Sequence, residues 1–207
     1  MFKNHDPRII RGIIYLTAYL ASIIGAAALV VYVGPVPVGL GLVAPAGAYL
    51  VGVTLVLRDL TQDQLGPRVT YGAIIIGTIL SALMSPEVAL GSAAGFLIAE
   101  TFDLLVYTPI RARGHLIVAV LASNAVSILL DSFVFLQIAF GDLTFLWGQV
   151  WAKTLGTVAA VILLPWIYRN RMDKRPAYLV ARDNQNNNGP GSDSDGPRSH
   201  RAQEVTA

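Results

Sequence analysis

The chain has 207 residues, of which 54% are hydrophobic and only 14% are charged, and its mean hydropathy is +0.58. Ordinary soluble domains carry about 25% charged residues, so this composition excludes a typical soluble protein and indicates a membrane protein with several spans. The sequence pI of about 9.0 is compatible with a nucleic-acid partner, but the basic residues lie where topological markers are expected, so we predict no such partner.

Six apolar segments approach or reach the length that crosses a bilayer, about 20 residues for a helix. The predicted spans are residues 12–33, 38–57, 69–84, 88–107, 115–139 and 147–168. A polar lead, 1–11, precedes them, and a basic juxtamembrane segment with a polar tail, 171–207, follows the domain at 12–170. The tail from residue 181 lacks the apolar residues to order itself. We therefore predict an all-α membrane protein with six transmembrane helices and a disordered tail.

Turn residues agree with this division of the chain. The prolines in 34–37 are expected to end the first span, because proline has no backbone donor and disfavours helix in the preceding residue. Residues 85–87, Ser-Pro-Glu, have the pattern of a helix start and are expected to begin the fourth span. Pro45 lies inside the second predicted span, where it should kink the helix or leave a carbonyl group free for a ligand.

The basic residues predict the orientation. Every lysine and arginine except Lys153 lies in the lead, between the second and third spans, between the fourth and fifth spans, or after the sixth span. The other three connections have none. Because cytoplasmic loops of membrane proteins are enriched in Lys and Arg, both termini are predicted to be cytoplasmic, in a multi-pass protein of the cytoplasmic (inner) membrane.

Polar side chains interrupt three of the predicted spans. Glu100 and Asp103 lie one turn apart in the fourth, Asn124 and Asp131 share one face of the fifth, and Lys153 lies in the sixth. Ionisable groups at such depth are costly and usually mark a working site. At 1.5 Å per residue, Glu100 and Asn124 lie at similar depths, as do Asp131 and Lys153. Each of the three helices thus carries a polar stripe on one face, and we expect the three stripes to face one another across an internal cavity.

Structural roles for the same residues remain open. Asp131 and Lys153 can form a purely structural ion pair, because a paired charge is less costly in hydrocarbon than an unpaired one. Arg58 and Asp59, at the cytoplasmic end of the second predicted span, fit an interfacial pair better than a ligand site. Glu100 has no basic partner within a predicted span, so a structural role suits it less well.

The sequence lacks the residues that several common kinds of catalytic and metal site require. There is no cysteine for a disulfide, a thiolate metal site or a nucleophile, and the sequence contains no P-loop, no H-E-x-x-H helix and no G-x-S-x-G motif. We therefore predict no catalytic residue, no cofactor and no metal site, and expect that the protein is not an enzyme. The remaining alternatives are a membrane-embedded enzyme with Glu100 and Asp103 as an acid and base pair, and a structural assembly protein.

Four stretches resemble one known family. They are Ala44-Pro45 followed by Val56-Leu57-Arg58-Asp59-Leu60-Thr61 and Gly66; Ala99-Glu100-Thr101-Phe102-Asp103 with Tyr107 and Ile110-Arg111; Asp131-Ser132-Phe133 with Ile138-Ala139-Phe140; and Lys153 followed by Leu164-Pro165. In this order they resemble the VUT, or vitamin uptake transporter, family, and within it the YhhQ-type queuosine precursor transporters. The resemblance covers about residues 12–170.

The resemblance implies a six-helix carrier, similar in fold to the substrate-binding components of ECF-type vitamin importers, that takes up 7-deazaguanine precursors of queuosine. The substrate-binding residues that we predict from the stripes and the resemblance are Glu100, Asp103, Asn124, Asp131, Lys153 and Asp59. An alternative is a substrate-binding subunit for another vitamin-like molecule. Such a subunit needs a separate energising module, docked on the face of Ala18, Ser22 and Ala26.

The chemistry of a 7-deazaguanine suits these residue types. Its ring N–H and exocyclic amine form a donor edge, and one carboxylate can accept both hydrogen bonds. Four aromatic side chains near the stripes are available to stack on the flat ring, namely Phe102, Tyr107, Phe135 and Trp151. The expected partners are therefore this purine-like small molecule, the lipid bilayer and, in the alternative, the energising module.

Overall fold

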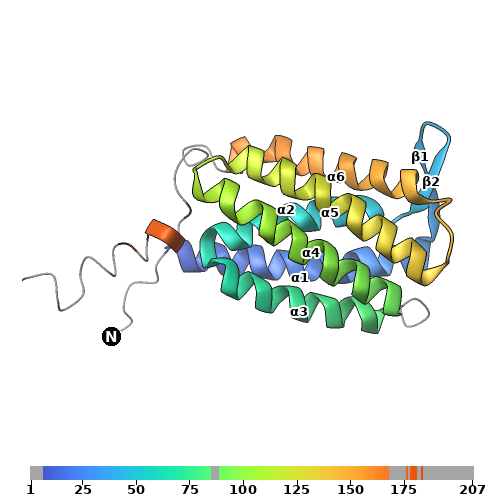
Figure 1. The fold of residues 1–207 in the computed structure, drawn as a ribbon, viewed down its shortest axis with the longest axis horizontal. Coiled ribbons are helices and arrows are strands. Elements are labelled where there is room, and N and C mark those ends of the chain that lie inside the picture. The colour runs from blue at the N-terminus through green and yellow to red at the C-terminus, as the bar shows by residue number, and fades with distance from the viewer. Residues whose placement is uncertain (1–6, 85–88, 168–175, 177, 181–182, 184–207) are drawn as a thin grey trace, which may run out of the picture.

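The computed structural model describes residues 7–84, 89–167, 176, 178–180 and 183. Within them six helices lie side by side in one elongated bundle, with a β-hairpin at one end (Figure 1). The elements are α1 (Pro7–Val33), β1 (Pro35–Gly39), β2 (Leu42–Pro45), α2 (Ala48–Leu65), α3 (Pro67–Met84), α4 (Ala89–Ala112), α5 (Leu116–Ala139) and α6 (Leu146–Ile167).

Successive helices run in opposite directions along the bundle (Figure 1). The hairpin and the connection between α5 and α6 lie at one end, which we call the hairpin end. The start of α1, the connection between α4 and α5 and the end of α6 lie at the other end. The connections at the hairpin end that the structure describes, residues 34–47 and 140–145, contain no Lys or Arg.

In the part of the chain that the structure describes, four helices are long and apolar enough to cross a membrane, with spans at Arg8–Val33, Leu90–Ala112, Leu116–Ala139 and Leu146–Leu163. A shorter apolar helix, Pro67–Leu83, accompanies them. This is the arrangement of a multi-pass membrane protein. The count of six spans and the cytoplasmic location of both termini stay predictions.

The helix α2 is enclosed by its neighbours. It contacts α1, α3, α5 and α6, and its second half is buried on almost every side, from Arg58 to Gln64. Charged side chains on α2 therefore face other helices rather than lipid, which is where intramembrane charges are tolerated.

Small residues allow the close approach of α2 and α6. A Cβ atom at Gly52 would collide with the backbone oxygen of Lys153, and one at Gly156 would collide with the backbone oxygen of Tyr49. Backbones this close are typical of glycine-lined contacts between membrane helices. The contact fixes the position of Lys153 against α2.

The predicted second span, 38–57, is wrong in its first part. Residues 35–45 form an antiparallel hairpin in which Pro35 pairs with Pro45, so Pro45 does not kink a helix. The turn residues Leu40 and Gly41 have φ angles of 55° and 72°, as a type I′ hairpin turn requires. The prolines and glycines of this stretch disfavour helix, but a prediction from hydropathy alone does not take this preference into account.

Other helix boundaries also differ from the predictions. The first span ends at Val33 as predicted, but α1 begins at Pro7, so part of the lead is helical. The helix α2 continues to Leu65, and α4 continues to Ala112. Arg58 and Arg111 are therefore helical residues, not loop residues. The predicted helix start at 85–87 and nearly all of the tail lie outside the described residues.

Candidate functional site

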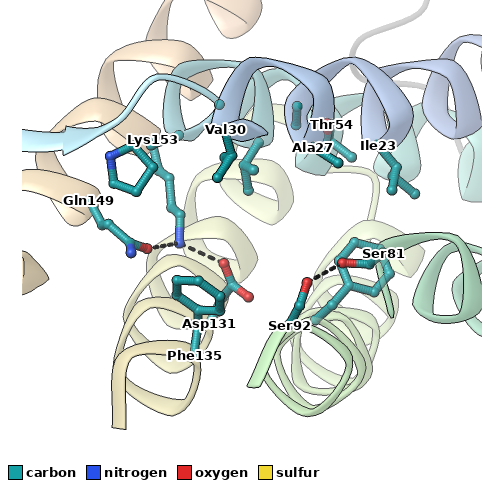
Figure 2. A pocket seen from close by; sticks show the side chains of 16 residues that line it. Ile23, Ala27, Val30, Thr54, Ser81, Ser92, Asp131, Phe135, Gln149 and Lys153 are labelled. Atoms are coloured by element: carbon teal, nitrogen blue, oxygen red, sulfur yellow. Dashed lines mark hydrogen bonds and ion pairs between the residues drawn. The ribbon is translucent and has the colours of Figure 1, made fainter. Parts of the chain in front are cut away.

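A cavity of about 110 Å³ lies in the half of the bundle nearer the hairpin, and all six helices and β2 contribute to its wall (Figure 2). Much of the wall is apolar, from Ile23, Ala27 and Val30 on α1 to Phe96 on α4 and Phe135 on α5. The polar lining residues are Thr54, Ser81, Ser92, Asp131, Gln149 and Lys153. An apolar wall with a few converging polar groups is typical of a small-molecule site.

A buried lysine organises the polar side of this cavity. Lys153 Nζ lies 2.6 Å from Asp131 Oδ2 and donates hydrogen bonds to Gln149 Oε1 and Ser132 Oγ, both at 2.9 Å. An ammonium group has three donors, and all three are used here. The predicted pairing of Asp131 with Lys153 is confirmed.

This group retains capacity to bind a ligand. The side chain of Asp131 is 18% exposed, whereas that of Lys153 is 3% exposed, so the carboxylate is the accessible member of the pair. Gln149 Nε2 is buried and has no hydrogen-bond partner among the described residues. The cavity therefore offers one acceptor and one donor side by side (Figure 2).

Hydroxyl groups line the facing wall. Ser81 of α3 and Ser92 of α4 form a short hydrogen bond with each other (Figure 2). Thr54 of α2 lies 2.8 Å from the hydroxyl group of Ser22 on α1. Of the three residues predicted to dock an energising module, Ser22 and Ala26 are buried, whereas Ala18 is partly exposed; docking of such a module stays a prediction.

One of the four aromatic residues predicted to stack on substrate lines the cavity, and that residue is Phe135. A second ring, Phe96, lines it without having been predicted. Phe102 is 47% exposed on the outside of the bundle, Tyr107 is buried in an apolar cluster, and Trp151 donates a hydrogen bond to the hairpin. The aromatic surface of the cavity is therefore formed by α4 and α5.

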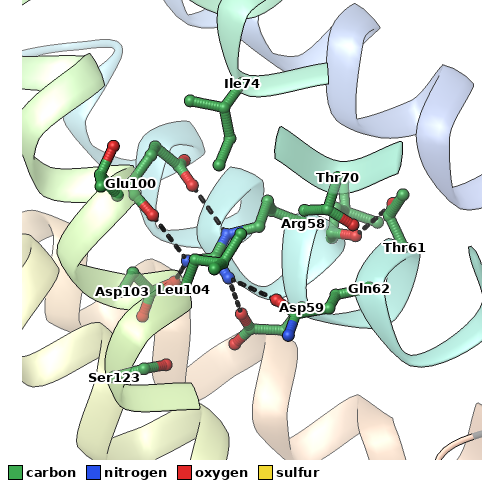
Figure 3. A network of polar contacts seen from close by, with 12 residues as sticks. Arg58, Asp59, Thr61, Gln62, Thr70, Ile74, Glu100, Asp103, Leu104 and Ser123 are labelled. Atoms are coloured by element: carbon green, nitrogen blue, oxygen red, sulfur yellow. Dashed lines mark hydrogen bonds and ion pairs between the residues drawn. The ribbon is translucent and has the colours of Figure 1, made fainter. Parts of the chain in front are cut away.

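A second polar cluster lies deeper in the bundle and centres on Arg58 of α2 (Figure 3). Arg58 Nε lies 2.7 Å from Glu100 Oε2, Nη1 lies 3.1 Å from Asp59 Oδ1, and Nη2 pairs with Asp103. All four side chains are fully buried. We call these four residues the Arg58 cluster.

Two predictions about the cluster are wrong. Arg58 and Asp59 are not at an interface, because α2 extends past them and neighbouring helices enclose both side chains. Glu100 does have a basic partner, which is Arg58. Both errors follow from ending the second span at Leu57, which assigned the arginine to a loop.

The polar contacts continue from the Arg58 cluster towards the end opposite the hairpin. Arg58 Nη1 donates to Gln62 Oε1 at 3.2 Å, and Gln62 Nε2 donates to Thr108 Oγ1 at 2.8 Å. Beyond them Arg111 Nε lies 2.6 Å from Asp63 Oδ1. Arg111 is therefore a buried, paired residue rather than the loop residue that was used as a topological marker.

Two polar residues of α5 lie between the cavity and the deeper cluster. Asn124 and Ser127 are buried, and their side-chain polar atoms have no hydrogen-bond partner in the part of the chain that the structure describes. Asn124 was expected to meet Glu100, but no hydrogen bond joins them. Buried polar groups are nearly always paired with protein, water or ligand, so these two are candidates for contact with a bound molecule.

The six predicted site residues thus separate into three places. Asp131 and Lys153 meet at the cavity, whereas Asp59, Glu100 and Asp103 meet at Arg58. Asn124 forms a hydrogen bond with neither group. Among the described residues, no group of three or more His, Asp or Glu side chains is arranged to hold a metal ion.

Comparison with known families agrees with a transport role. Residues 78–170 match the family model described as "Putative vitamin uptake transporter". The match begins near the end of α3 and includes α4, α5 and the described part of α6, and hence both members of the cavity ion pair. No curated protein and no solved structure was found to match the chain. This part of the chain is therefore similar to vitamin uptake transporters.

Proposed function

We propose that this protein imports a 7-deazaguanine precursor of queuosine, such as 7-cyano-7-deazaguanine, across the cytoplasmic membrane. The observation that carries the proposal is the cavity with a charged pair in its wall, inside a bundle of membrane-capable helices. The similarity of residues 78–170 to vitamin uptake transporters supports it. The protein binds and moves its substrate and does not convert it.

The cavity residues fit the polar edge of such a molecule. Asp131 Oδ2 is held by Lys153, and the exposed part of the carboxylate can accept the ring N–H and the exocyclic amine. The unpartnered Gln149 Nε2 can donate to the carbonyl oxygen of the substrate. A 7-deazaguanine presents both kinds of group within one ring system, so one substrate can satisfy both side chains.

The aromatic residues fit its flat face. Phe96 and Phe135 line the cavity from adjacent helices, and stacking of a base on an aromatic side chain contributes about 1 to 3 kcal/mol in other nucleobase binders. Polar and aromatic contacts together distinguish a heterocyclic substrate from an aliphatic one of similar size.

In the proposed orientation the hairpin end faces outward. The cavity then lies near the outer side, and the Arg58 cluster lies between it and the cytoplasm. Substrate enters beside the hairpin, because Pro45 and Gly47 form part of the cavity wall. Release to the cytoplasm requires the deeper ion pairs to rearrange.

Uptake into proteoliposomes tests this proposal. Purified protein is reconstituted alone, and entry of labelled 7-cyano-7-deazaguanine is measured for the wild type, Asp131→Asn and Lys153→Met. Both variants should lose at least about tenfold in initial uptake, because each removes one partner of a hydrogen-bonded buried charge pair. Unchanged uptake in both variants contradicts the proposed site.

Two matched controls lie outside the cavity. Asp142→Asn removes an exposed carboxylate from the connection between α5 and α6, and Arg113→Met removes an exposed cation near the end of α4. Both should transport like the wild type. If wild-type protein binds the substrate but accumulates it only with a separate ATP-driven module, the chain is a substrate-binding subunit, and solitary import is wrong.

A further inference from the structure

The charges of the Arg58 cluster do not balance. Three carboxylates, Asp59, Glu100 and Asp103, surround the one guanidinium group of Arg58, and all four side chains are fully buried. The ion pairs among the described residues give these carboxylates no cation except Arg58, because Arg111 pairs with Asp63 and Lys153 pairs with Asp131. With every carboxylate ionised, two negative charges remain uncompensated in the interior, which is strongly unfavourable.

The carboxylate oxygens of the cluster also have too few hydrogen-bond donors. Of the six carboxylate oxygens, Oε2 of Glu100 accepts a hydrogen bond from Arg58 Nε. Asp59 Oδ2, Asp103 Oδ1 and Glu100 Oε1 have neither a hydrogen-bond nor an ion-pair partner among the described residues, whereas Asp59 Oδ1 and Asp103 Oδ2 contact only Arg58. Buried ionised groups need donors as well as counter-charge. A proton on one carboxyl group removes a negative charge and adds an O–H donor at the same time.

The Tyr19 hydroxyl group is a buried polar group near the cluster. The Tyr19 hydroxyl group of α1 is fully buried without a hydrogen-bond partner among the described residues, and it interacts electrostatically with Glu100, Arg58 and Asp59. A phenol group both donates and accepts a hydrogen bond. It can therefore follow a proton that moves between the carboxyl groups.

Asn124 lies on α5 at the level of the cluster. Close contact of Gly95 with Asp131 sets the antiparallel register of α4 and α5, and two turns further along α4 this register places Asp103 level with Asn124. The buried, unpartnered amide of Asn124 therefore lies at the level of the carboxylates along the bundle.

Three polar side chains of α5 extend from the level of the cluster to the cavity. Asn124, Ser127 and Asp131 follow one another at intervals of three and four residues on one face of α5, over a rise of about 10 Å. Asn124 and Ser127 are buried and have no hydrogen-bond partner in the described ranges. These side chains give the α5 face between the cluster and the cavity carboxylate a polar surface in an otherwise apolar helix.

The remaining titratable neighbours are accounted for. On α4, Tyr107 lies one turn beyond Asp103 in the buried stripe. On α2, Asp63 follows the cluster but is paired with Arg111. On α6, Lys153 is bound to Asp131. Among the described residues, no titratable side chain of α3 forms an ion pair with the cluster.

We propose that Asp59, Glu100 and Asp103 share a transported proton around Arg58, and that uptake of substrate is coupled to entry of this proton. One carboxyl group takes a proton from the outer side and later releases it to the cytoplasm, so one proton crosses with each substrate molecule and Arg58 keeps its charge throughout. The coupling rests on the proposed import, whereas the proton site itself does not.

The proton site is tested without substrate. Infrared difference spectra of the reconstituted protein should show a protonated carboxyl band at neutral pH, and the band should shift or disappear in Asp59→Asn, Glu100→Gln or Asp103→Asn. The control Asp142→Asn should leave it unchanged. If none of the three variants alters a protonated carboxyl band, the proton site is overturned.

The coupling is tested by accumulation in proteoliposomes with the membrane potential clamped at zero. Coupling of one proton to one neutral substrate allows accumulation of up to about tenfold for each unit of pH difference, inside alkaline. The wild type and Asp142→Asn should accumulate the substrate when the pH gradient is applied. For Glu100→Gln and Asp103→Asn, accumulation with the gradient divided by accumulation without it should be close to one. This ratio does not depend on how active each variant is.

The two ways of failing are distinguishable. Transport that ignores the pH gradient, or that follows a sodium gradient instead, overturns the coupling. Absence of transport in every preparation contradicts the proposed import, and the infrared bands then still decide whether the cluster holds a proton.

Discussion

The two buried charge clusters differ in balance and in access. At the cavity, Lys153 pairs with one carboxylate, Asp131, and the carboxylate is partly exposed. At the deeper cluster, Arg58 faces three carboxylates, and every side chain is fully enclosed. A balanced and accessible pair can receive a ligand directly, whereas an enclosed and unbalanced one is suited to gain or lose a proton. In the proposed mechanism, the cavity pair recognises the substrate and the Arg58 cluster couples its uptake to a proton.

The largest effect is expected at the unbalanced cluster. Arg58→Met leaves three buried carboxylates without their cation, and removing one member of a buried ion pair costs about 3 to 5 kcal/mol. We expect a correspondingly lower free energy of unfolding for the detergent-solubilised protein, measured by denaturant titration. Arg113→Met, an exposed matched control, should stay within about 0.5 kcal/mol of the wild type. Similar stabilities for the two variants would mean that the guanidinium group is not needed to neutralise the cluster.

The balanced cluster should respond differently to a double substitution. Lys153→Met alone should destabilise by about 3 kcal/mol, because Asp131 is left without its cation. Adding Asp131→Asn removes the stranded charge, so the double variant should recover part of this stability while its uptake remains lost. A double-mutant cycle measures the difference. Simple addition of the two single effects would show that the pair is not coupled.

The sequence allowed the cavity pair to be predicted but not the deeper cluster. Counting residues placed Asp131 and Lys153 at one depth because α5 and the start of α6 agree closely with their predicted spans. Arg58 was assigned to a loop, since hydropathy falls where α2 becomes polar, although α2 continues as a helix inside the bundle. The spacing of Arg58 and Gln62 by four residues was the available signal, because it places both on one helical face.

The hairpin was missed for a related reason. Residues 35–45 are apolar enough to resemble part of a span, but their prolines and glycines specify a turn and two short strands. Partners such as the Arg111–Asp63 pair depend on which helices are neighbours, and a single sequence does not give that arrangement.

The contact that positions Lys153 offers a smaller effect. Gly52→Ala places a methyl group against the backbone oxygen of Lys153, so α2 and α6 must separate, at a cost of about 1 to 3 kcal/mol. Substrate affinity should fall together with stability. The control Gly72→Ala has open space around it and replaces a helical glycine, so it should be neutral or stabilise by up to about 1 kcal/mol. Equal effects at the two glycines would contradict the close contact.

The hairpin turn offers the smallest effect. Leu40 has a φ of 55°, which costs a non-glycine residue about 1 to 2 kcal/mol. Leu40→Gly relieves this strain, and the gain in unfolding free energy should be below about 1 kcal/mol, because glycine also increases the entropy of the unfolded chain. Leu40→Val should instead destabilise, and a stabilising valine would contradict the left-handed turn.

The central claim is that the cavity binds a 7-deazaguanine through Asp131. Equilibrium binding of labelled 7-cyano-7-deazaguanine to the purified wild type and to Asp131→Asn, with unlabelled queuine, guanine and biotin as competitors, tests it most directly. We predict saturable binding to the wild type, displacement by queuine but not by biotin, and a loss of at least about tenfold in affinity for Asp131→Asn. Equal affinity of the two proteins, or displacement by biotin, would contradict the account.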